Sequence, residues 1–180
     1  KLTQNAYIFE DSTSNLKITD ISSSSFTEKF KKVNESEVHI PYSYSTWWIR
    51  LELLNTNRFE RSMILEIENS TIDFIQFFYI EDGVLNETNE TGDNRPYVTR
   101  DLANINFCYN INLQGLNTTI VYLKIKPNGD ALNFPITLNS TKEFIKKTNY
   151  SILINGFFYG LMILLILISF LMIITFSSIT

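Results

Sequence analysis

The hydrophobic pattern divides the chain into a long mixed region and a short, wholly apolar one. From Ile152 to Phe176 no charged residue occurs, and Asn155 and Ser169 are the notable polar side chains inside the stretch. About 20 apolar residues suffice for an α-helix to cross the hydrocarbon core of a bilayer. A buried core helix seldom runs this long without a charge, and a signal peptide would lie at the other end. We therefore expect a transmembrane helix over residues 151–176.

Before residue 140, hydrophobic and polar positions alternate with a period of two, which is typical of β-strands. The clearest run is Trp47 to Leu53, and in the run from Ile72 to Ile80 both sets of alternate positions are largely apolar. The second run therefore predicts a strand that is buried on both faces. The other predicted strands are Leu16–Ile21, Met63–Ile67, Phe107–Leu113, Val121–Ile125 and Phe134–Leu138.

Turn-forming residues separate these runs, as in the segments Thr91-Gly92-Asp93-Asn94 and Asn128-Gly129-Asp130. No helical period of useful length occurs before Ser140. About seven or eight strands of this spacing predict an all-β fold, an antiparallel jelly-roll β-sandwich over residues 1–140. Residues 141–150 are expected to form a stalk or short helix that leads into the membrane.

Charge and cysteine content narrow the function classes only a little. The formal net charge is −4, which argues against a nucleic-acid-binding protein, because such proteins carry a basic stripe. Cys108 is the only cysteine, so no disulfide forms within the chain. Because the first residue is Lys1 and the sequence stops soon after the apolar stretch, we expect that a signal peptide was removed or that the chain is part of a longer protein.

The residues that enzymes and metal sites require are scarce. His39 is the only histidine, which excludes a site built from several histidines, and Cys108 lies mid-strand among apolar neighbours. No nucleophile elbow, phosphate loop or zinc-protease helix is present. A sandwich hydrolase with paired carboxylates is the least favoured hypothesis, because nothing selects two among Glu52, Glu66, Glu68 and Asp73. We expect no enzyme activity, no metal and no cofactor in this chain.

Aromatic side chains and one loop are the better candidates for ligand binding. Trp47 and Trp48 are adjacent and point to opposite faces of a strand, so one belongs to the core and the other is able to face a ligand or lie under a loop. The loop from Thr91 to Arg100 carries two arginines that could hold an anionic or hydroxyl-rich ligand, although a structural loop with locally paired arginines is the plainer interpretation. The candidate ligand-binding residues are Trp48, Asp93, Arg95, Tyr97 and Arg100.

Several short motifs in a fixed order resemble a known family. The strand Trp47-Trp48-Ile49-Arg50 that ends in Asn55 is followed by Leu65-Glu66-Ile67, by Ile72-Asp73-Phe74-Ile75, by Thr91-Gly92-Asp93 and Arg95-Pro96-Tyr97, by Thr119 to Ile125, and by Gly156-Phe157-Phe158-Tyr159-Gly160. In this order they resemble the second type of extracellular domain of the bacterial seven-transmembrane receptors with diverse intracellular signalling modules. The resemblance runs from about Tyr7 to the apolar stretch, although residues 169–180 depart from the polar turn expected after a first helix.

The resemblance implies a jelly-roll domain similar to carbohydrate-binding modules, placed in the periplasm or outside the cell and anchored in the bacterial cytoplasmic membrane. Six further helices and a cytoplasmic output, such as a histidine kinase or a nucleotide cyclase, would follow. The positive-inside rule conflicts with this, because Lys142, Lys146 and Lys147 precede the apolar stretch and would be placed in the cytoplasm. We give the resemblance more weight, since the flank beyond the stretch is absent.

The leading hypothesis is therefore a periplasmic domain that binds a small molecule, such as a carbohydrate, and signals through the membrane. The alternative is a membrane-anchored binding or adhesion module without signalling. Expected partners are the ligand, the lipid bilayer, the remaining helices of the same receptor and a second copy in a homodimer, but no nucleic acid. Gly156 and Gly160 form a small-xxx-small pair suited to close helix packing.

Overall fold

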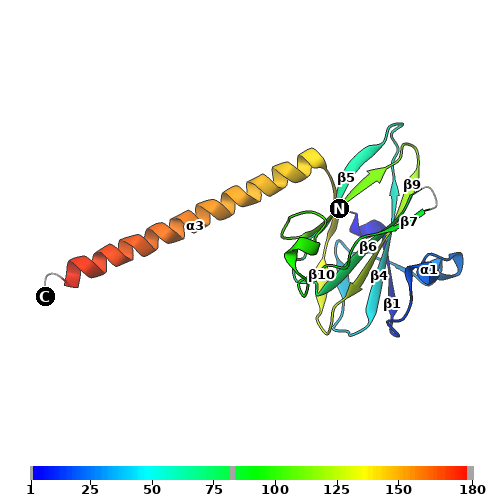
Figure 1. Cartoon of the computed structure of the whole chain (residues 1–180), viewed down its shortest axis with the longest axis horizontal. Helices are drawn as coiled ribbons and strands as arrows, with labels where there is room; N and C mark the ends of the chain where they lie inside the picture. The colour runs from blue at the N-terminus through cyan, green and yellow to red at the C-terminus, as the bar shows by residue number, and fades with distance from the viewer. Residues whose placement is uncertain (1, 82–83, 178–180) are drawn as a thin grey trace. The chain divides into compact units, whose positions relative to one another are not determined.

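The computed structural model describes residues 2–81 and 84–177, and the chain divides into two compact units at Ser140. The first unit is built almost entirely of antiparallel strands, and the second is the single helix α3 (Thr141–Ser177) (Figure 1). The prediction of an all-β sandwich followed by an apolar helix is thus confirmed.

One layer of the sandwich is a six-stranded sheet in the order β2-β1-β4-β9-β6-β7. Its strands are β1 (Ala6–Asp11), β2 (Lys31–Lys32), β4 (Thr46–Leu54), β6 (Phe74–Glu81), β7 (Val84–Glu87) and β9 (Thr118–Lys126). The second layer contains a three-stranded sheet, β11-β5-β8, and the pair β10-β3. Its strands are β3 (Val38–Ile40), β5 (Arg61–Ile67), β8 (Phe107–Leu113), β10 (Leu132–Phe134) and β11 (Ile136–Ser140).

The two parts of the second layer are joined where Pro135 divides β10 from β11. Proline has no backbone N–H, so it interrupts the ladder at this point. If β10 and β11 are taken as one strand, the two layers have the orders β4-β9-β6-β7 and β3-β11-β5-β8, with β1 and β2 added beside β4. From β3 onward the strands alternate between layers except at the β6–β7 hairpin, which is the jelly-roll connectivity.

Apolar side chains from the facing sides of both layers form the main core. Ile49, Leu51 and Leu123 from one layer meet Leu65 and Ile67 from the other, and all five are essentially inaccessible to solvent. A second, smaller cluster lies on the outer side of the six-stranded sheet, where α1 (Ile18–Ile21) and the segment around Phe30 pack against Trp48, Phe78 and Tyr122. The neighbours Phe77 and Phe78 are buried on opposite faces, which confirms the prediction for this strand.

The predicted strand over Leu16–Ile21 is wrong, because this segment contains helix α1, followed by α2 (Ser24–Thr27). The backbone N–H of Lys17, the residue before α1, donates to Asp20 Oδ2 at 2.9 Å, so this N–H has a hydrogen-bond acceptor at the start of the helix. Ile18 and Ile21 then lie one turn apart and both are buried against the outer cluster. The sequence interpretation also missed β1, β2, β3 and β7.

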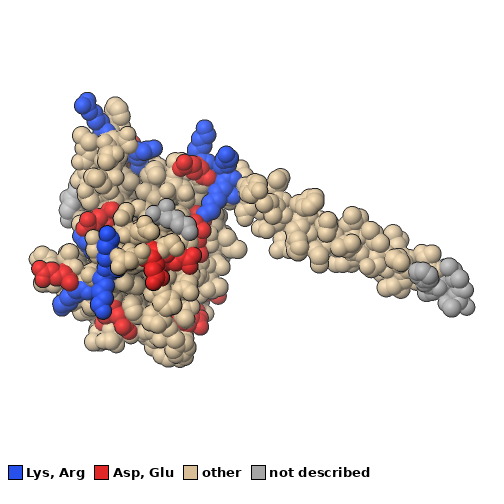
Figure 2. Space-filling view, turned by 180° about the vertical axis from the view of Figure 1, so that it is seen from behind, with Lys and Arg blue, Asp and Glu red and all other residues tan. Residues whose placement is uncertain are grey.

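The helix α3 is uniformly apolar after its first turns. It is, among the described residues, the one helix that is long and apolar enough to cross a bilayer. Figure 2 shows that the charged side chains lie on the β-domain and at the beginning of α3. The rest of the helix surface visible in this view carries no charged side chain. The segment predicted as a stalk or short helix, residues 141–150, is part of this continuous helix.

Candidate ligand-binding site

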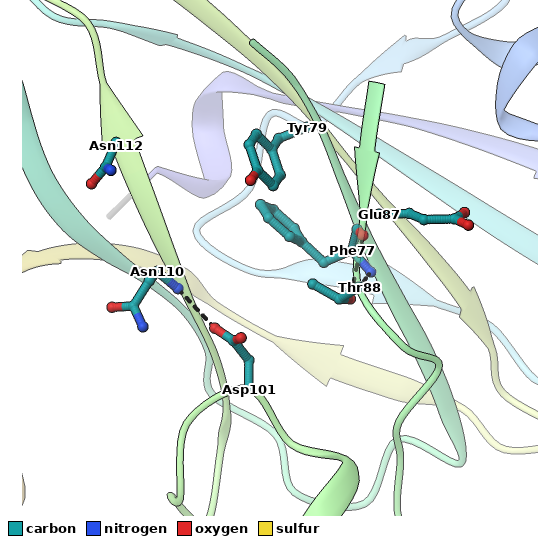
Figure 3. Close-up of a pocket in the computed structure, with 7 residues that line it drawn as sticks. All are labelled: Phe77, Tyr79, Glu87, Thr88, Asp101, Asn110 and Asn112. Atoms are coloured by element: carbon teal, nitrogen blue, oxygen red, sulfur yellow. Dashed lines mark hydrogen bonds between the residues drawn. The ribbon is translucent and has the colours of Figure 1, made fainter. Parts of the chain in front are cut away.

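Two adjoining cavities open at the edge of the sandwich where β7 and β8 are the last strands of their sheets. The first has a volume of about 330 Å³ and the second about 420 Å³, and they share Glu87, Thr88 and Asp101. We call the two together the edge groove. Figure 3 shows the first cavity, which is lined by Phe77 and Tyr79 from β6 and by Asn110 and Asn112 from β8.

Aromatic rings form the inner wall of the edge groove. The rings of Phe77 and Tyr79 are stacked with centroids 5.7 Å apart, and Phe77 is stacked on Tyr109 at 4.6 Å with 15° between the ring planes. Phe77 and Tyr109 are buried, whereas Tyr79 is partly exposed. Such offset stacks fix the rings against one another, so the wall is rigid.

Polar groups that line the edge groove are held by backbone contacts. Asp101 Oδ2 accepts the backbone N–H of Asn110 at 3.1 Å, which ties the loop after β7 to the edge of β8 (Figure 3). Thr88 bonds through its backbone N–H to the carbonyl of Phe77 at 3.0 Å, and this contact continues the pairing beyond β7. The edge groove therefore combines two carboxylates, amides and a hydroxyl beside aromatic rings.

Arg100 holds the loop that forms the outer wall. Its Nη1 donates to the backbone carbonyls of Asn104, at 2.8 Å, and of Ile105. Its guanidinium group also lies 4.5 Å from the ring centroid of Phe107 and 5.1 Å from that of Tyr97. Arginine suits this position because its planar fork bonds carbonyls while its face stacks on rings.

Arg95 and Asp93 lie on the same loop but do not line the edge groove. Arg95 Nη2 is 2.6 Å from Glu90 Oε1, and its guanidinium carbon is 4.8 Å from the ring centroid of Phe74. Gly92 has a φ of 150°, and a Cβ there would come within 1.9 Å of the Asp73 carbonyl oxygen, so the loop requires glycine. Burial, then Asp130 and Asp93, raise the pKa of the Asp73 carboxyl.

The remaining predicted residues are scattered. Trp48 is fully buried beneath α1, so its ring has no face open to a ligand, and Tyr97 is exposed beside Arg100. Of the five residues predicted to bind ligand, only Arg100 lines the edge groove among the residues that the structure describes. Gly156 and Gly160 are one turn apart on α3, and an added Cβ at either would meet no atom within 4 Å.

Sequence reasoning missed most of the groove-lining residues. A usable signal existed on β8, where Asn110 and Asn112 are the exposed positions that alternate with buried Tyr109, Ile111 and Leu113. Asp101 gave no local signal, because it lies outside any strand and reaches β8 only through the path of the loop. Within residues 2–81 and 84–177, no cluster of His, Cys, Asp and Glu side chains is arranged to hold a metal ion.

Comparisons with known proteins identify the family of this chain. A β-glucosidase from Kluyveromyces marxianus, solved in complex with glucose, aligns with 10% sequence identity and a TM-score of 0.43, over 76% of this chain and 15% of the enzyme. No curated protein sequence matches. A family model described as 7TMR-DISM extracellular 2 matches residues 3–140, which is the whole sandwich. The chain therefore belongs to the 7TMR-DISM extracellular 2 family, whose members are the extracellular sensor regions of transmembrane receptors.

Proposed function

We propose that this sensor region binds a neutral carbohydrate in the edge groove and relays its occupancy through α3 to a cytoplasmic effector. The family membership supplies the receptor context, and α3 is the candidate span. The resemblance described in the sequence analysis implied a carbohydrate ligand, and the chemistry of the edge groove supports that ligand class.

The observation that carries the proposal is the meeting of aromatic rings with carboxylate and amide groups in one cavity. Sugars present apolar C–H faces that pack on aromatic rings, and hydroxyls that donate to carboxylates or amides. Tyr79 offers a partly exposed ring, and Glu87, Asp101, Asn110 and Asn112 line the same cavity. The cavity volumes lie in the range of small-ligand sites.

The charges of the edge groove favour a ligand without acidic groups. Glu87 and Asp101 line both cavities. Arg100 is the cation that lines the second cavity, and its Nη1 already donates to two backbone carbonyls. An acidic sugar would bring a negative charge close to two carboxylates, which disfavours binding, whereas neutral hydroxyls find acceptors.

The arrangement of the second layer offers a route for the relay. The groove-lining strand β8 and the last strand β11 both pair with β5, so that Asn110 is opposite Ile64 and Ile64 is opposite Asn139. β11 ends at Ser140 and α3 begins at Thr141 without an intervening loop. A ligand produces a signal here only if it binds two states of the domain with different affinity.

The membrane arrangement follows from the same proposal. α3 would be the first helix of a bundle in the bacterial cytoplasmic membrane, with the β-domain outside it. Gly156 and Gly160 would allow a neighbouring helix to approach closely, either within one receptor or in a homodimer.

Binding of a sugar panel to the chain in lipid nanodiscs tests the proposal. Isothermal titration calorimetry with neutral, amino and acidic oligosaccharides should show binding that prefers neutral sugars. Tyr79→Ala should weaken that binding by about twofold to tenfold, because an aromatic contact contributes about 0.5–1.5 kcal/mol. Tyr42→Ala is the matched control, since Tyr42 is an exposed tyrosine outside the edge groove. Absence of binding to every sugar, or equal losses in both variants, would contradict the proposal.

A further inference from the structure

The hydroxyl group of Tyr109 is a hydrogen-bond donor that the folded domain leaves unused. Tyr109 lines the larger cavity of the edge groove and is 1% exposed. Its hydroxyl oxygen is buried and has no hydrogen-bond partner among the described residues. A buried polar group without a partner is costly, and the large majority of such groups in folded proteins are bonded.

The ring position and protonation of Tyr109 keep this donor in place. The stack on Phe77, with ring centroids 4.6 Å apart, fixes the ring between the two layers. Burial, and then the nearby Asp101 carboxylate, raise the pKa of the Tyr109 phenol. The hydroxyl therefore stays protonated at physiological pH and is able to donate to a ligand atom.

The cavity that Tyr109 lines also contains a hydrogen-bond acceptor. Asp101 lines the same cavity and uses Oδ2 to accept the Asn110 N–H, which leaves its other oxygen able to accept from a ligand. A donor and an acceptor side by side complement a group that carries both a carbonyl oxygen and an N–H. Resting on the proposed carbohydrate function, we infer that the edge groove selects sugars with an acetamido group, whose carbonyl accepts from Tyr109 and whose N–H donates to Asp101.

The same geometry explains why a simple hydroxyl would serve less well. A carbonyl oxygen projects from the sugar ring on its own short arm, whereas a ring hydroxyl stays close to the ring. The Tyr109 hydroxyl is buried, and the loop residues Val98, Thr99 and Asp101 line the same cavity, so a ligand atom reaches the hydroxyl only when this wall gives way. This wall is a loop with outward-facing Val98, and loops yield more readily than strands.

A pair of disaccharides with the same linkage isolates the acetamido group. N,N′-Diacetylchitobiose and cellobiose have the same β1–4 backbone and differ in carrying acetamido or hydroxyl groups at the second carbon. Titration of each into the chain in nanodiscs should show roughly fivefold to tenfold tighter binding of the acetamido sugar, the value of one net hydrogen bond. Equal affinities, or binding of other sugars but of neither disaccharide, would overturn the inference and leave the carbohydrate proposal standing.

Tyr109→Phe removes the hydroxyl and keeps the ring that stacks on Phe77. It should abolish the preference for N,N′-diacetylchitobiose while cellobiose binding is retained. Without sugar, its unfolding temperature should be unchanged or raised, because an unpartnered buried group is lost. Tyr122→Phe, in the outer cluster, is the control that should leave the preference intact. A lowered unfolding temperature of the Tyr109→Phe variant would show that the hydroxyl is bonded in the free protein and would overturn the inference. Failure of every sugar to bind the unaltered chain would refute both proposals.

Discussion

Two groups of aromatic side chains lie back to back on the six-stranded sheet, and they differ in what covers them. Trp48, Phe78 and Tyr122 on the outer face are closed off by α1 and the segment around Phe30. Phe77 and Tyr79 on the inner face reach the open edge, where carboxylates and amides line a cavity. Aromatic content alone therefore does not distinguish the two groups, and our proposed binding site depends on the polar groups that line the cavity beside Phe77 and Tyr79.

The largest effect that separates the two groups is expected from Trp48→Ala. The Trp48 side chain is fully buried and its ring lies 5.8 Å from that of Phe78, so the truncation leaves a large cavity. The free energy of unfolding should fall by about 3–5 kcal/mol, as measured by urea denaturation followed by near-ultraviolet circular dichroism. Sugar affinity below the unfolding range should be unchanged. Trp47→Ala is the control, and it should lower the free energy of unfolding by less because Trp47 is only partly buried. A marked loss of sugar affinity in the Trp48→Ala variant would contradict this prediction and place the Trp48 ring at the ligand.

A moderate effect is expected from Arg100→Lys, which tests the outer wall of the edge groove. Lysine lacks the planar fork that bonds the carbonyls of Asn104 and Ile105, so the loop should loosen. Sugar affinity should fall about threefold to tenfold, and hydrogen exchange over residues 97–106 should accelerate, with little change in the unfolding midpoint. Arg95→Lys is the control, because Arg95 pairs with Glu90 outside the edge groove. Identical behaviour of the two variants would remove Arg100 from its positioning role.

The smallest effect concerns Lys124, whose ammonium lies 5.4 Å from the ring centroid of Trp48. Burial, and then Lys126, lower the pKa of Lys124 from its ordinary value of 10.5. Between the lowered pKa and 10.5 the unfolded chain binds more protons than the folded one, so stability should rise with pH in that window. The gain should be on the order of a few tenths of a kcal/mol, because solvent screens this partly exposed group. Lys124→Met should reduce the rise of the unfolding temperature with pH in that window, while Lys31→Met should not. An unchanged profile in the first variant would contradict the assignment.

The strands of the sandwich were predictable wherever one face is buried and the other is not. β8 matches its predicted bounds of Phe107 and Leu113, and β4 and β9 extend their predicted runs by one to three residues at either end. α1 was mistaken for a strand because Leu16, Ile18 and Ile21 are too few to distinguish a period of two from one of 3.6. β1 was missed because Tyr7, Ile8 and Phe9 are apolar in succession, since both of its faces contact hydrophobic clusters.

The candidate site was much less predictable than the fold. The edge groove forms because β7 and β8 are the edge strands of their sheets. The sequence around Phe77 or Asn110 does not indicate which strands lie at an edge. Arginines in a polar loop suggested ligand contacts, but Arg95 is paired with Glu90 and Arg100 with backbone carbonyls. The proposed binding residues come from four segments, namely β6, the end of β7, the loop before β8 and β8 itself, and only the tertiary fold brings them together.

The bond between Asp101 and the Asn110 amide has a consequence for the solubility of the domain. An edge strand with unpaired backbone N–H groups can pair with a strand of another molecule, and proteins protect such strands against aggregation. At Asn110 the carboxylate occupies the place that a foreign carbonyl would take. The residue that we assign to ligand recognition thus also occupies one backbone N–H at which the strand of a neighbouring molecule could pair.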